Sequence, residues 1–107
     1  MPVIKIFSDQ RPDAPACEAL AQSLRALCVG PMGARPDAIQ VMLVSGTAML
    51  DGASVFVEAH YRDRPDRRGP ALAAFLEGVD QSVQLAFGEK PRIRSFAVDP
   101  DTSGAVL

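Results

Sequence analysis

The segment MPVIKIFS, residues 1–8, predicts a β-strand that begins at the amino terminus itself. From Pro2 to Ser8 the side chains alternate, so that valine, lysine and phenylalanine fall on one face and two isoleucines on the other. The strand ends at a Ser-Asp pair, which favours a turn. The first strand of the sheet therefore follows directly on a proline at position 2.

A helix and a second strand complete the first half of the chain. Residues 14–28 place leucine and cysteine side chains at helical spacing, with Asp13 as the predicted cap and Gly30-Pro31 as the stop. The nearly continuous apolar run Ile39–Val44 is typical of a strand that is covered on both faces or lies at an interface. This half is a βαβ unit.

The second half repeats the same order of elements. Ser54–Tyr61 predicts a strand, and Asp66 is the predicted cap of a second helix that carries Pro70 in its first turn and ends at Gly88. The alternating segment Arg92–Val98 predicts the last strand, after which a polar tail begins.

The two halves, about 2–45 and 54–98, are therefore an internal repeat of structure, and we expect residues 1–107 to form a single domain. The predicted fold class is α+β, with two layers: two βαβ units form one four-stranded sheet, and right-handed crossovers place both helices on one face. The other sheet face needs cover that a single chain does not supply. This predicts a homo-oligomer.

Composition excludes several classes of partner. With 13 acidic and 11 basic residues the net charge is −2, so no basic field indicates nucleic acid. No stretch near the start is long and apolar enough for a signal peptide or a membrane span, which favours a cytoplasmic protein. One histidine, two cysteines and no Cys-x-x-Cys motif are poor material for a metal site. We expect no metal and no cofactor.

A Met-Pro start followed directly by a strand, in a chain of two βαβ units, resembles the tautomerase superfamily over nearly its whole length. The resemblance implies a cofactor-independent enzyme in which removal of Met1 exposes Pro2 as the catalytic acid or base. It also implies a homotrimer, because the longer members of the superfamily are trimers of double βαβ subunits.

Two local motifs carry the resemblance further. Arg62-Asp63-Arg64, at the end of a predicted strand, looks like the Arg-x-Arg of malonate semialdehyde decarboxylase, where paired arginines hold the substrate carboxylate. Asp37 lies just before the second strand, where the decarboxylase has an aspartate that assists hydration. The related dehalogenases have their second arginine where Pro65 stands here, which disfavours that activity.

A hydrophobic wall around the proline completes the pattern of the superfamily, and Phe96, Met42 and Phe56 are the candidates for it, from this subunit or a neighbouring one. The polar tail after Val98 contains no aromatic residue, unlike the aromatic tail of the decarboxylase. We expect Arg67 and Arg68 to face solvent.

Three functions stay open at this point. The first is interconversion of the keto and enol forms of a small carboxylate substrate, with Pro2 as general acid or base and Arg62 with Arg64 as the carboxylate site. The second is decarboxylation or hydration of the malonate semialdehyde type, in which Asp37 takes part. The third is a non-catalytic oligomeric binding protein, in which the arginines form a solvated turn and Asp37 is an ordinary turn residue.

Overall fold

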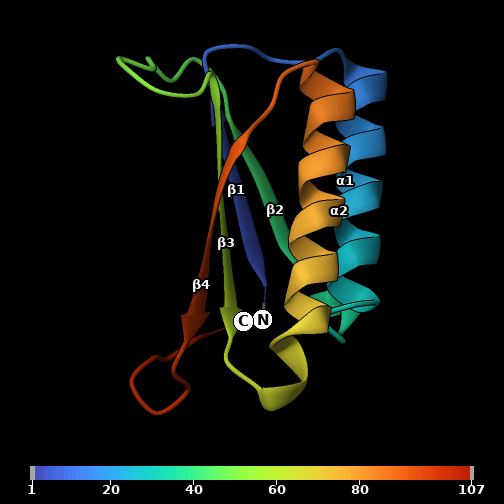
Figure 1. Cartoon of the computed structure of the whole chain (residues 1–107), viewed down its shortest axis with the longest axis vertical. Helices are drawn as coiled ribbons and strands as arrows, with labels where there is room; N and C mark the ends of the chain where they lie inside the picture. The colour runs from blue at the N-terminus through green and yellow to red at the C-terminus, as the bar shows by residue number, and fades with distance from the viewer. Residues whose placement is uncertain (1, 107) are drawn as a thin grey trace.

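The computed structural model describes residues 2–106, which form a sheet with two long helices packed against it (Figure 1). In chain order the elements are β1 (Val3–Ser8), α1 (Ala14–Val29), the 3-10 turn η1 (Pro36–Ala38), β2 (Gln40–Val44), β3 (Val55–Arg62), the 3-10 turn η2 (Pro65–Arg67), α2 (Pro70–Phe87) and β4 (Arg92–Val98). The four strands and two helices occupy the segments that the sequence pattern predicts, with ends that shift by one residue, except that α2 begins three residues later than predicted.

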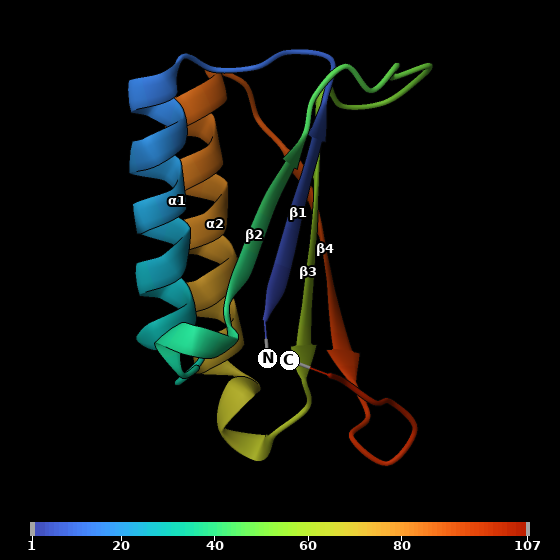
Figure 2. The same ribbon diagram turned by 180° about the vertical axis from the view of Figure 1, so that it is seen from behind.

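The sheet has the strand order β2-β1-β3-β4. Within each half the strands are parallel, β1 with β2 and β3 with β4, and the two halves join through the antiparallel pair β1 and β3. Both helices lie on the same face of the sheet, as Figures 1 and 2 show from opposite sides. The predicted α+β fold of two βαβ units is therefore confirmed.

The helix ends follow local chemistry, with one correction to the sequence analysis. The side chain of Asp13 accepts a hydrogen bond from the Ala16 amide at 2.9 Å, which caps α1, and Gly88 ends α2 in the left-handed conformation at φ 73°. The prediction that Asp66 caps α2 is wrong. The residue at that position is Gly69, whereas Asp66 lies in η2 and binds Arg64. An arginine fork two residues away competes successfully for the carboxylate.

The core lies between the sheet and the helices. Its largest members face each other across that gap: isoleucines from β1, valines from β3, and Leu24, Phe75, Val79 and Val83 from the helices, all at most 1 % exposed. The two helices touch closely at Gly78, where a Cβ would stand only 2.4 Å from Leu27 Cδ2. The absence of a side chain at Gly78 therefore sets how near the helices can pack.

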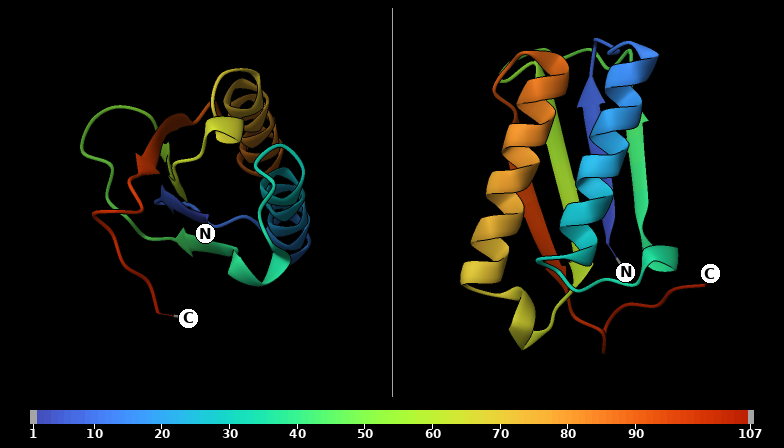
Figure 3. Two further views of the ribbon diagram at one scale, coloured as in Figure 1. Left: turned by 90° about the horizontal axis from the view of Figure 1, so that it is seen from below. Right: turned by 90° about the vertical axis from the view of Figure 1, so that its right-hand side faces the viewer.

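The opposite face of the sheet has no helix over it among residues 2–106 (Figure 3). It mixes apolar and charged side chains. Met42, Val44 and Phe96 are 36 to 43 % exposed there, and Lys5 lies opposite Glu58 in the register. We call this surface the open sheet face.

Candidate active site

A cavity of about 420 Å³ opens at the end of the sheet where β1 begins and β3 ends. Pro2 lines it together with four arginines: Arg35, Arg62, Arg64 and Arg67. Small residues complete the lining, from the loop after α1, from η1 and from the carboxyl-terminal tail. Positive charge and a proline from distant parts of the sequence thus meet in one cavity.

Pro2 is held firmly in the wall of this cavity. It is less than 2 % exposed, and its carbonyl oxygen accepts a hydrogen bond from the Gln40 amide at 3.0 Å. That bond continues the pairing of β1 with β2, so the sheet itself fixes where the nitrogen of residue 2 lies. The predicted removal of Met1 lies outside residues 2–106, which are the residues that the structure describes.

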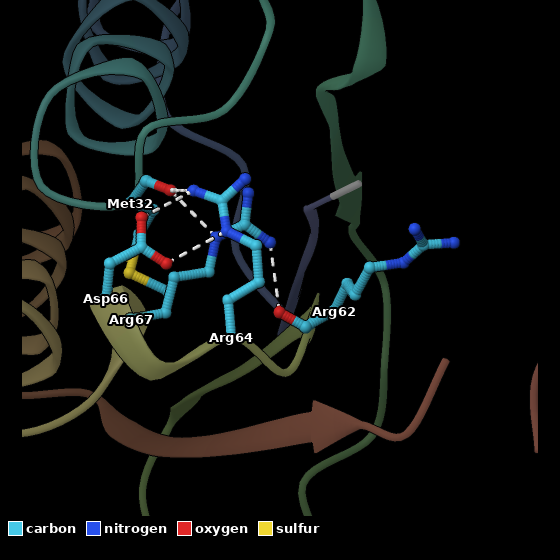
Figure 4. A network of polar contacts seen from close by, with 5 residues as sticks. All are labelled: Met32, Arg62, Arg64, Asp66 and Arg67. Atoms are coloured by element: carbon cyan, nitrogen blue, oxygen red, sulfur yellow. Dashed lines mark hydrogen bonds and ion pairs between the residues drawn. The ribbon is translucent and has the colours of Figure 1, made fainter. Parts of the chain in front are cut away.

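Arg67 is buried, so the prediction that it faces solvent is wrong. Its side chain is 4 % exposed; Nε donates to the Met32 carbonyl oxygen at 2.8 Å and Nη1 to the Arg62 carbonyl oxygen at 3.0 Å. The turn η2 reverses the chain and directs this side chain under the loop after α1 (Figure 4). Burial, and next the charge of Arg64, lower the pKa of Arg67 from its ordinary value. Arg68 is exposed and pairs with Asp63, as expected.

Arg64 lies beside Arg67 but is already paired. Its Nε and Nη2 donate to the two carboxylate oxygens of Asp66 at 3.0 and 2.9 Å, and Nη2 is also 3.4 Å from the Met32 carbonyl oxygen. The hydrogen bond from Arg64 lowers the pKa of Asp66. The carboxylate is therefore ionised throughout the neutral range, and the pair is lost only when the pH falls through that lowered pKa.

Arg62 takes a different direction from the other two. Its carbonyl oxygen binds Arg67, but its guanidinium extends away from Arg64 and Arg67 (Figure 4). Successive side chains of a strand point to opposite sides, and Arg62 is the last residue of β3. Within one subunit all three residues line the cavity, but the guanidinium groups of Arg64 and Arg67 lie side by side and that of Arg62 points away from them.

Asp37 and Phe96 lie away from the lining of the cavity. The Asp37 side chain is 72 % exposed and pairs at 3.2 Å with Arg35, which lines the cavity. Phe96 is on the open sheet face, where its ring stacks on His60 with the centroids 4.7 Å apart. Their predicted roles in the site stay predictions.

The Arg64 side chain packs against Gly33, where a larger residue would crowd it. The φ of Gly33 is +58°, and a Cβ there would lie 3.1 Å from Arg64 Nη2. We expect Gly33→Ala to cost about 1 to 2 kcal/mol of unfolding free energy, from backbone strain, and to weaken binding of a small anion such as malonate. Gly52→Ala is the matched control, because φ is +88° there and no atom lies within 4 Å of the added Cβ. Calorimetric titration of both variants measures the difference; equal affinities for malonate would contradict a role for this contact.

Residues 2–106 lack two further features. Between residues 2 and 106, no group of at least three His, Cys, Asp or Glu side chains is placed to hold a metal ion. No helix of that segment is long and apolar enough to cross a membrane.

Known proteins resemble this chain in fold and not in sequence. No family model matches the sequence, and no curated protein matches it. Solved structures do match. A fused 4-OT, solved as an asymmetric trimer, has a TM-score of 0.80 at 13 % identity, covering 96 % of this chain and 91 % of that chain. The macrophage migration inhibitory factor-like protein from Entamoeba histolytica has a TM-score of 0.77 at 9 % identity, covering 98 % and 95 %. Pt0534, inactivated by 2-oxo-3-pentynoate, has a TM-score of 0.74 at 15 % identity, covering 96 % and 90 %.

The double βαβ architecture thus defines the class of structure as a two-layer α+β domain. Within that class, the likeness to 4-OT and to a macrophage migration inhibitory factor-like protein shows that the chain shares their fold. At 8 to 16 % identity these comparisons establish the fold and leave the activity to be argued from the site.

Proposed function

We propose that this protein is a cofactor-independent tautomerase, which interconverts the keto and enol forms of a small carboxylate substrate with Pro2 as general acid and base. The observation that carries the proposal is the position of Pro2, buried in a cavity that four arginines also line. The fold supports it, since 4-OT and macrophage migration inhibitory factor share the same architecture. The proposal requires that Met1 be removed, because a proline acylated by methionine has no basic nitrogen.

The chemistry follows from the surroundings of the Pro2 nitrogen. Burial next to cations disfavours the protonated amine, so the free secondary amine is available as a base. It takes a proton from the carbon next to the substrate ketone, and the electrons of that C–H bond move to the carbonyl oxygen to form an enolate. The protonated amine then returns the proton to another atom of the substrate. The arginines bind the substrate carboxylate and stabilise the negative charge of the enolate.

We also propose that the protein acts in the cytoplasm as a homotrimer. The open sheet face carries exposed Met42, Val44 and Phe96, which a second copy would cover. The 4-OT structures that share the fold were solved as trimers. In such an assembly Phe96 and Met42 of one subunit are candidates for the hydrophobic wall of a site on the next.

The direct test is ketonisation of phenylenolpyruvate, followed by ultraviolet absorbance, together with labelling by 2-oxo-3-pentynoate, which inactivated the structural relative Pt0534. We expect turnover, and a single covalent adduct that peptide mass spectrometry places on residue 2. Absence of turnover, or an adduct on any other residue with activity retained, would contradict the proposal. Binding of carboxylates without turnover would instead support the non-catalytic alternative.

Replacement of Asp37 separates the tautomerase from the decarboxylase or hydratase alternative. Asp37 and Arg35 are about 70 % exposed, and an exposed pair contributes at most about 1 kcal/mol. Asp37→Asn is therefore expected to change the rate of ketonisation by less than about fivefold. If the substitution abolishes decarboxylation of malonate semialdehyde and spares ketonisation, the decarboxylase alternative is correct and Asp37 is catalytic.

A further inference from the structure

Arg67 is the buried arginine of the cavity, and among residues 2–106 it makes no ion pair with a carboxylate. Between residues 2 and 106, Arg35 pairs with Asp37, Arg64 with Asp66 and Arg68 with Asp63, whereas Arg67 has only carbonyl partners. Arg62 also has no carboxylate partner there, but it is exposed and its guanidinium points away from Arg64 and Arg67 (Figure 4). The buried thiol of Cys28 is also near it, and burial raises the pKa of Cys28 to about 11. The thiol is therefore neutral at physiological pH and supplies no negative charge.

The guanidinium of Arg67 is fixed in place but only partly used. It has five N–H donors, and its hydrogen bonds within residues 2–106 involve Nε and Nη1, which leaves both donors of Nη2 free. No fully buried side-chain nitrogen or oxygen of those residues lacks a partner, so the free end of this guanidinium is not sealed in the protein. Arg67 lines the cavity that also contains Pro2, and an anion would reach the free donors from that cavity.

An unneutralised cation in a nearly buried position is costly unless an anion joins it. The exposed fraction of Arg67 is only 4 %, so an anion that binds there is attracted through a medium much less polar than water. Two carbonyl oxygens hold the guanidinium plane, which means that little side-chain freedom is lost when the anion binds. Arg64, by contrast, must share its fork with Asp66.

From these observations we infer that Arg67 is the residue that binds the carboxylate of the substrate in the Pro2 cavity, with Arg64 in support. This inference rests on the proposed function for the identity of the ligand, and assigns the anchor to a residue outside the Arg62-Asp63-Arg64 motif. The carboxylate accepts hydrogen bonds from the free guanidinium donors, and the reacting carbon is thereby presented to Pro2.

The test measures binding of malonate and of its neutral counterpart malonamide by calorimetric titration, which needs no turnover. The wild-type chain is expected to bind malonate at least about tenfold more tightly than malonamide. Arg67→Met is expected to weaken malonate binding by about 10- to 100-fold and to remove the preference for the anion, because charge-assisted hydrogen bonds contribute about 1.5 to 3 kcal/mol. Arg68→Met, at an exposed position one residue away, is the matched control and should change affinity by less than about twofold.

A second variant is needed because Arg67 also donates hydrogen bonds to two carbonyl groups, so that Arg67→Met could disturb the fold. Arg67→Lys keeps the charge without the planar fork, and should bind malonate about 5- to 10-fold more weakly than the wild type. Circular dichroism checks that each variant is folded. The inference is overturned if the wild type shows no preference for malonate, or if a folded Arg67 variant binds malonate as the wild type does.

The same experiment distinguishes this inference from the proposed function. Pro2→Ala should keep Arg67-dependent malonate binding, because position 67 and not position 2 supplies the anion site. If ketonisation is never observed while malonate binding depends on Arg67, the tautomerase proposal fails and the anion site stands. In an active enzyme, Arg67→Lys should raise KM more than it lowers kcat, since the anchor acts mainly on the bound substrate.

Discussion

Replacing Pro2 with alanine is expected to lower kcat for phenylenolpyruvate by about 10²- to 10⁴-fold, the range that a positioned general acid or base contributes. The proline ring fixes the backbone torsion next to its nitrogen, and the Gln40 amide fixes its carbonyl, so the nitrogen occupies one place in the cavity. Alanine supplies a primary amine without the ring, and the proton acceptor is no longer held toward the substrate. Absorbance assays of phenylenolpyruvate ketonisation by the purified variant measure the fall in kcat.

Pro15→Ala is the matched control for this experiment. Pro15 is exposed in the first turn of α1, far along the chain from the cavity, and alanine is well tolerated in a helix. Its kcat should match that of the wild type. If Pro2→Ala retains wild-type kcat while intact mass shows that Met1 is absent from both proteins, the proline is not the acid or base.

Replacing Phe75 with alanine is expected to lower the unfolding free energy by about 3 to 5 kcal/mol, the range measured for removal of a buried aromatic side chain. Phe75 is 1 % exposed and projects from α2 into the core, in line with Val79 and Val83. The total free energy of unfolding of a domain of this size is only about 5 to 15 kcal/mol, so the variant should denature at a much lower concentration of urea.

Leu85 on the same helix provides the comparison. Its side chain is 88 % exposed, so Leu85→Ala should change the unfolding free energy by no more than about 0.5 kcal/mol. Equal effects at the two positions would mean that α2 does not present Phe75 to the sheet, which would contradict the arrangement of the core. Urea denaturation of both variants, followed by circular dichroism, gives the comparison.

Much of this fold can be predicted from the sequence because its strands and helices carry different hydrophobic periods. The alternation in residues 2–8 and 92–98 and the helical stripe in α2 each specify one kind of element, and the βαβ rule then places both helices on one face. Asp66 is a position at which the sequence pattern gave the wrong prediction. A carboxylate before a helix fits the capping pattern, but the pattern does not show that Arg64 reaches it first.

The candidate site was harder to predict because side-chain direction depends on one turn of 3-10 helix. In the sequence, Arg67 and Arg68 are neighbours in a charged segment and look equally solvated. The turn η2 buries the first and exposes the second. Pro65-Asp66 at the start of that segment is the signal that could have indicated a tight turn, and with it a reversal of direction at Arg67. Gly33 and the tail residue Ala105 reach the cavity through loop geometry alone, which no pattern in the sequence specifies.

The role of Pro2 as acid and base is tested most directly by the intact mass of the chain expressed without an amino-terminal tag, which is the first measurement to make. Catalysis by Pro2 predicts a mass lighter than that of the 107-residue sequence by one methionine residue, which leaves Pro2 as a free secondary amine. A mass that retains Met1 in all of the protein would contradict it, because the nitrogen in the arginine-lined cavity would then be an amide with no proton to give or take.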